Sequence, residues 1–213
     1  PQAAGPVAFA LVALALTGDT SAGAAMILSM TLAQVIGAIP ITRFGRAFAP
    51  TTFLRLLVLF RTIALGTLAL LAHYGAPVIW LVAASALAGL VNGAAAGYLR
   101  TILNALAPAS KLPRALGIAS TLNETTFVLA PVAASGLGTV SPVLAIVAIA
   151  ALGAIPAFLL PTVRSEASPD DIHAPDASII SPSILLWLMC AAAGGATVAA
   201  LEIGAVALAL HFG

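Results

Sequence analysis

Glu124 is the residue of this sequence whose type and setting point most directly to chemistry. It follows Asn123 within an apolar stretch that begins after Arg114. If that stretch is a membrane helix, its rise of 1.5 Å per residue places the carboxylate about 15 Å deep, near the middle of a bilayer. A charge at that depth costs at least ~2.5 to 3.5 kcal/mol, so we expect Glu124 to face the bundle interior, a cavity or a cation. It could accept a proton or bind a solute, because desolvation favours the neutral form, and a structural ion pair is the competing interpretation.

Two arginines are possible partners for this acid. Arg61 lies inside another apolar stretch and is expected to be the closer of the two in depth, whereas Arg100 lies near the end of its stretch. For Arg100 we favour an interfacial anchor whose side chain snorkels to the headgroups. Asn92 and Gln34 could hydrogen-bond a solute, although bonding to another helix is the favoured interpretation.

Composition indicates what kind of structure must position these residues. Of the 213 residues, 62% are hydrophobic and only 7% are charged, and the mean hydropathy is +1.14. Such a chain is typical of integral membrane proteins, and its partner is the lipid bilayer. The net charge of +1 and the scattered basic residues exclude nucleic acid as a partner.

Seven apolar segments are predicted to be transmembrane helices, because only helices and closed barrels satisfy their backbone groups in lipid, and barrels show short alternating segments. They are residues 6–17, 22–42, 52–71, 78–99, 116–140, 143–163 and 184–210. The predicted fold class is therefore an all-α polytopic membrane bundle. The first segment is too short for a full crossing and the last ends abruptly, so both ends are expected to be trimmed.

The loops alternate in charge. Arg43 and Arg46 follow the second segment, and Arg100, Lys111 and Arg114 surround the connection after the fourth, whereas the alternate connections contain no Lys or Arg. The positive-inside rule then predicts that the basic loops and the N-terminus are cytoplasmic, in a protein of the cell membrane.

Metal and cofactor chemistry finds little support. Residues 164–183 are hydrophilic, and Asp170, Asp171 and His173 within them could offer metal ligands, but a solvated flexible linker is the preferred interpretation. The single cysteine, Cys190, cannot build a thiolate metal site within this chain. No metal and no cofactor are assigned.

The fourth segment carries Gly89, Gly93 and Gly97, a doubled G-x-x-x-G pattern on one helix face. Small faces of this kind let helix backbones approach closely in lipid, where the hydrophobic effect no longer drives association. Tight packing is favoured over a dimerisation motif.

Thr42-Arg43-Phe44-Gly45-Arg46, after the second segment, resembles the G-x-x-x-D-R-x-G-R motif of the major facilitator superfamily of secondary transporters. Arg43, Gly45 and Arg46 match in register, whereas Thr42 replaces the acid and Ala38 the first glycine. In relatives the acid makes a gating salt bridge, which this chain could not form in the same way.

The fifth segment resembles the glycine-rich motif of the family's exporters. Gly117 and Pro131 are identical to that motif, and its other positions hold small residues: Thr126, Ala130, Ala134 and Ser135. The resemblance implies an N-terminal six-helix half at 1–163, a cytoplasmic central linker at 164–183, and a seventh helix at 184–213 that begins a second half absent from this chain. It further implies a secondary active transporter of small solutes working by alternating access, with proton-coupled efflux as the favoured mode and the second half expected in the same full-length chain.

Two other function classes were weighed. An intramembrane enzyme would need a catalytic pair at one depth, but His73, His173 and His211 fall in loops or at ends, so no enzyme activity is predicted. A non-transporting membrane scaffold or sensor would be recognised by a packed bundle without a polar cavity.

Overall fold

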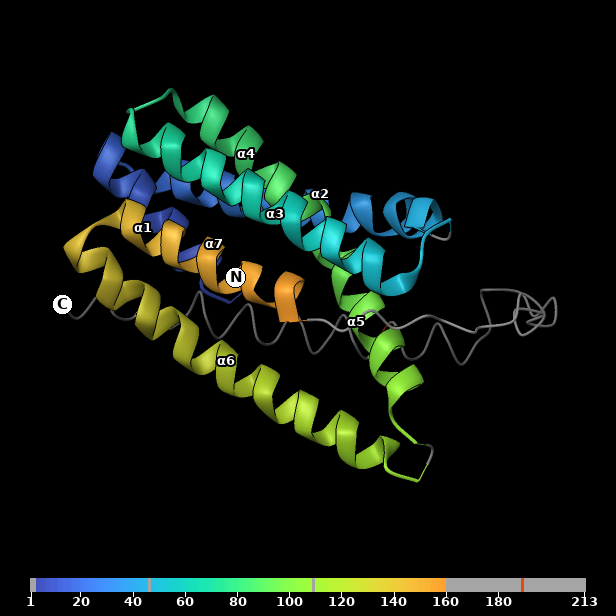
Figure 1. Ribbon diagram of the computed structural model, residues 1–213. Coiled ribbons are helices and arrows are strands. Elements are labelled where there is room, and N and C mark those ends of the chain that lie inside the picture. Colours follow the sequence, from blue (N-terminus) through green and yellow to red (C-terminus); the bar gives the residue numbers. More distant parts are fainter. Residues whose placement is uncertain (1–2, 46, 109, 160–188, 190–213) are drawn as a thin grey trace. The chain divides into compact units, whose positions relative to one another are not determined.

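The computed structural model describes residues 3–45, 47–108, 110–159 and 189, and every regular element in these residues is an α-helix. The chain divides into a compact unit, Pro1–Ser165, and a second unit, Glu166–Gly213, which lies almost entirely outside the described residues. The helices of the first unit (Figure 1) are α1 (Gly5–Thr17), α2 (Thr20–Gly45), α3 (Pro50–His73), α4 (Val78–Leu90), α5 (Asn92–Leu106), α6 (Leu112–Val140) and α7 (Pro142–Leu159).

Three stretches are long and apolar enough to cross a membrane: Ser21–Gly45, Pro50–His73 and Val78–Asn104. α1 and residues Pro142–Ile155 of α7 are apolar but shorter. These features mark the chain as an integral membrane protein and confirm the all-α class. The first six predicted segments coincide with helices as far as residue 159, whereas the predicted linker at 164–183 and seventh helix at 184–213 lie outside the described residues.

The predicted segment 78–99 is interrupted at one residue. α4 ends at Leu90 and α5 begins at Asn92, with Val91 between them at φ −94° and ψ −10°. α2 makes its closest approach here, because a β-carbon added to Gly89 would overlap the backbone of Met30, and one added to Gly37 would overlap the carbonyl of Leu90. Val91 keeps right-handed helical dihedrals, and Val78–Asn104 remains one apolar stretch across this point.

The main core lies among α1, α2, α3, α4, α7 and the C-terminal part of α6, and consists of small and apolar side chains. A hydrogen-bonded serine pair lies within it: the Ser85 hydroxyl, fully buried, is 2.8 Å from the Ser29 hydroxyl and donates to the Met26 carbonyl at 3.1 Å. Such polar contacts hold helices together in lipid, where apolar burial alone gives no preference for protein over acyl chain.

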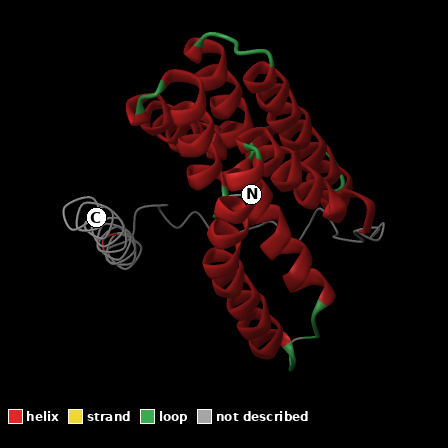
Figure 2. Ribbon diagram, turned by 90° about the vertical axis from the view of Figure 1, so that its left-hand side faces the viewer, coloured by secondary structure: helices red, strands yellow, loops and turns green. Residues whose placement is uncertain are grey.

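α6 is packed along only part of its length. Ala134 and Gly138, near its C-terminal end, are its buried residues, and a β-carbon on Gly138 would overlap the Leu11 side chain of α1. Residues 116–129 are exposed on all faces within the described unit. α5 and α6 meet at the short connection after Leu106 and diverge from it (Figures 1 and 2), which leaves a space between them.

Candidate solute-binding cavity

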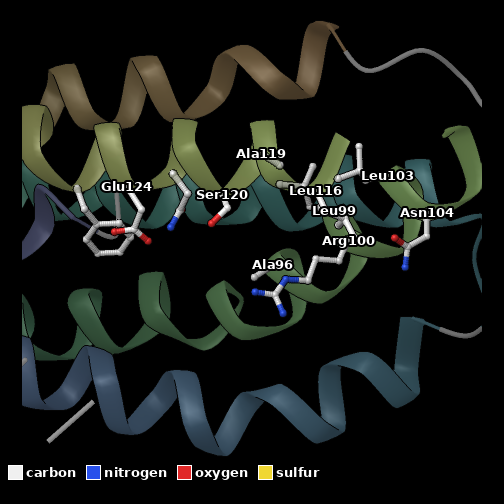
Figure 3. A pocket seen from close by; sticks show the side chains of 11 residues that line it. Ala96, Leu99, Arg100, Leu103, Asn104, Leu116, Ala119, Ser120 and Glu124 are labelled. Carbon is white, nitrogen blue, oxygen red and sulfur yellow. The ribbon is translucent and has the colours of Figure 1, made fainter. Parts of the chain in front are cut away.

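A cavity of about 800 Å³ lies between α5 and α6. Its lining residues are Ala96, Leu99, Arg100, Leu103 and Asn104 of α5, and Leu116, Ala119, Ser120, Asn123, Glu124 and Phe127 of α6. A volume of this size is within the range of sites for small organic ligands. Figure 3 shows these side chains directed into the space between the two helices.

Helical periodicity explains why these residues face one another. The α6 residues recur at steps of three and four from Leu116 to Phe127, and those of α5 do the same from Ala96 to Asn104. Positions three and four apart share one face of an α-helix, so each helix contributes a single stripe. The two stripes become a cavity because α5 and α6 diverge.

Arg100 and Glu124 supply opposite charges from opposite walls. Within the described part of the chain they form no ion pair with each other, and Figure 3 shows them at different positions along the cavity. The guanidinium of Arg100 extends toward Ala96, one turn back along α5, and so away from the connection after Leu106. This direction is the usual one for long side chains on a helix, and it carries the charge toward the body of the bundle.

The remaining lining is mixed. Ser120, Asn123 and Asn104 offer hydroxyl and amide groups that can both donate and accept hydrogen bonds. Apolar surface separates them, contributed by three leucines and Phe127. The arrangement can bind an amphipathic solute through a few polar anchors and an apolar wall, which is the common composition of ligand sites.

Three of the residues that the sequence predicts as site residues therefore meet at this cavity: Glu124, Asn123 and Arg100. Ser120 and Asn104 also line it and are not among the predicted residues. The available signal was spacing, because Ser120 precedes Glu124 by one turn and Asn104 follows Arg100 by one turn.

Arg61, Asn92 and Gln34 lie elsewhere. Arg61 donates from Nη1 to Oδ1 of Asn92 and from Nη2 to the carbonyl oxygen of Gly153, both at 3.3 Å. Asn92 is buried, and the bonds of Arg61 join α3 to α5 and α7. The Gln34 carbonyl lies at the contact of α2 with Gly93, 3.2 Å from where a β-carbon would stand. Arg61 and Asn92 thus form hydrogen bonds between helices.

The glycine face of the fourth segment divides in two. Gly89 and Gly93 lie against α2, whereas a β-carbon on Gly97 would meet no atom within 4 Å, and the same holds for Gly117 on α6. Only Gly89 and Gly93, the first two of the three glycines, therefore lie at a close contact between helices. Pro131 lies inside α6, which continues through it as a helix.

The loop motif after the second segment begins within α2. Gly45 is the last residue of that helix and is buried, and a β-carbon there would overlap the Phe53 ring and the Tyr98 hydroxyl. Thr42 donates to the Ala38 carbonyl at 2.7 Å within its own helix. Arg43 is exposed; Arg46 lies outside the described residues. Gly45 thus has a packing role that accounts for the absence of a side chain.

Asp19, between α1 and α2, caps the second helix. Its carboxylate accepts hydrogen bonds from the Ser21 hydroxyl and, at 2.9 Å, from the Ser21 backbone N–H. Those two bonds, the hydroxyl one first, lower the pKa of Asp19 below its ordinary value. An aspartate accepting from the first turn is a typical N-cap.

No protein-family model matches this chain, and no curated protein or solved structure is significantly similar to it. The fold and the cavity define its class: the chain is an all-α integral membrane protein with a charged, amphipathic cavity between two helices.

Proposed function

We propose that this chain is the N-terminal half of a secondary active transporter of small solutes, of the major facilitator type, and that the cavity between α5 and α6 belongs to its solute pathway. The observation that carries the proposal is that Glu124 and Arg100 line one cavity from opposite walls in a strongly apolar chain. Ionisable groups at membrane depth are costly, and in membrane proteins they mark solute and proton pathways.

The exposed part of α6 is consistent with a solute site of which this chain supplies only one half. Residues 116–129 carry Ser120, Asn123 and Glu124, and no described helix covers them on the side away from α5. In lipid such polar groups need protein or water around them. A second helical bundle, in the same full-length protein, would enclose this surface and place the cavity at the interface of two halves, where alternating-access carriers bind their solutes.

Proton coupling would reside in Glu124. Enclosure by a second half would remove the carboxylate from solvent, and protonation would remove the cost of its charge. A solute with a cationic group would compete with the proton for the same carboxylate. Exchange of proton for solute would follow, which is the efflux mode.

The placement of the loops supports the proposed orientation. Figure 1 shows the connection from α2 to α3 and that from α5 to α6 at one end of the bundle, and the connections from α3 to α4 and from α6 to α7 at the other. Arg43 and Lys111 are therefore at the same end. The positive-inside rule makes that end cytoplasmic.

Thiol labelling tests the proposal without a known substrate. In a full-length protein with Cys190 replaced by serine, an Ala119→Cys variant would place a thiol in the cavity. We expect a membrane-impermeant maleimide to label it both from outside intact cells and from the cytoplasmic face of inverted vesicles, because alternating access opens one site to each side in turn.

The control is Leu152→Cys, on an exposed position of α7 away from the cavity, which should remain unlabelled from both sides if it faces lipid. Labelling of the Ala119 variant from one side only, or from neither, would contradict alternating access at this cavity. A non-transporting scaffold predicts that result.

A further inference from the structure

Resting on the proposed transport function, we propose that the cavity between α5 and α6 selects bipolar solutes, which carry a cationic amine and an anionic carboxylate at opposite ends. The cavity holds one positive and one negative side chain at different levels, so a bipolar solute can pair with both.

The two charges belong to the cavity itself. Glu124 and Arg100 both line it, one on each wall. Figure 3 shows the guanidinium extending toward Ala96 within the cavity, where it can meet a ligand.

The two charges are separate anchors. Arg100 and Glu124 form no ion pair in the described structure, and the guanidinium and carboxylate lie at different levels of the cavity in Figure 3. A solute that pairs with both therefore carries its ammonium and its carboxylate on different parts of the molecule.

The rest of the lining offers both polar and apolar contacts to a solute. Ser120 lies between the carboxylate and the guanidinium in Figure 3, and the leucine side chains of the lining lie beyond the guanidinium, toward Asn104. A solute with one charge would leave the opposite protein charge without a partner once the cavity is enclosed, and an unpaired charge in a desolvated site is costly. Discrimination therefore comes from the unsatisfied partner as much as from the added contact.

Calorimetric binding to the full-length protein in lipid nanodiscs tests this with three matched probes. They are 6-aminohexanoate, which carries both charges, hexylamine, which has only the amine, and hexanoate, which has only the carboxylate; empty nanodiscs correct for partition into lipid. We expect 6-aminohexanoate to bind at least about tenfold more tightly than either, since one additional charge contact corresponds to roughly that factor.

Two variants assign the preference to its residues. Arg100→Gln should abolish the advantage of 6-aminohexanoate over hexylamine, and Glu124→Gln its advantage over hexanoate. The controls are Arg114→Gln and Thr125→Val. Both positions are exposed and lie on α6 outside the cavity lining, so both variants should keep both preferences.

Equal or weaker binding of 6-aminohexanoate to the unmodified protein, or preferences that survive both cavity variants, would overturn the proposal. The proposed transport function is tested separately, by the thiol labelling of the Ala119→Cys variant. Labelling of the Ala119 thiol from both sides without a bipolar preference removes only the inference on solute class, whereas bipolar binding with labelling from one side removes only transport.

Discussion

Replacement of Asn92 by leucine should destabilise the bundle by depriving Arg61 of one of its two hydrogen-bond acceptors. The substitution keeps the γ-branched shape and the number of side-chain heavy atoms, and Asn92 is only 7% exposed, so no cavity is created, and a double-mutant cycle separates the lost bond from the added bulk of leucine. A hydrogen bond to a charged group contributes ~1.5 to 3 kcal/mol in proteins generally. Polar couplings between membrane helices average ~0.6 and reach ~1.7 kcal/mol.

The geometry selects a value within these ranges. The Nη1 to Oδ1 distance is 3.3 Å, longer than the usual 2.9 to 3.0 Å for such a bond. The second bond of Arg61, to the Gly153 carbonyl, remains in the variant. We therefore expect a coupling free energy of about 1 kcal/mol between Arg61 and Asn92.

A double-mutant cycle isolates this quantity. The variants Asn92→Leu, Arg61→Met and the double variant would be compared with the unmodified protein by reversible unfolding in mixed micelles. Removing both partners removes the need of the cation for an acceptor, so the double variant should be more stable than the sum of the single effects predicts, by about 1 kcal/mol. Strict additivity of the two single effects would refute the role assigned to the bond.

Three further outcomes are expected. Glu124→Gln should leave thermal stability unchanged but abolish pH-gradient-driven solute movement in proteoliposomes, and retained gradient-driven accumulation would exclude it as the coupling residue. Gly89→Leu should lower the melting temperature in detergent far more than Gly97→Leu, because only the former side chain meets the backbone of α2, and equal shifts would contradict that packing. Because its hydrogen bonds with Ser21 lower the pKa of Asp19, the stabilisation it gives should be complete above its ordinary pKa and lost as pH falls through the lower folded-state value. Unfolding of Asp19→Asn should lack this acid dependence, and an unchanged profile would argue against the cap.

The helices were predictable because lipid leaves so few structural options. An apolar stretch such as 52–71 can satisfy its backbone only as a helix, and the structure has α3 at Pro50–His73. The contact of Gly89 with α2 was not predictable, because which glycine meets which helix is a tertiary property. Gly97 shows the same limit of sequence-based prediction. It belongs to the G-x-x-x-G pattern, but a β-carbon there would meet no neighbouring atom within 4 Å.

The cavity was predictable in part. Glu124 and Asn123 could be predicted as site residues because polar side chains are costly within an apolar membrane segment. Both line the cavity. Arg61 meets the same criterion, yet its bonds go to Asn92 and Gly153. Depth along a helix can be estimated from sequence, but the direction in which a residue faces depends on how the helices are arranged around it. Arg61 was a candidate partner for Glu124 only because the two residues were expected at similar depths in the membrane.

The junction between α6 and α7 has a consequence for how the protein enters the membrane. Only Ser141 separates the two helices, so α7 is synthesised directly after α6. α6 carries Asn123 and Glu124 and is not among the stretches apolar enough to cross by themselves, and inserting its carboxylate alone would cost at least ~2.5 kcal/mol. The strongly apolar α7 follows at once and can offset that cost. Biogenesis of the α6 segment would then depend on the sequence that is synthesised after it.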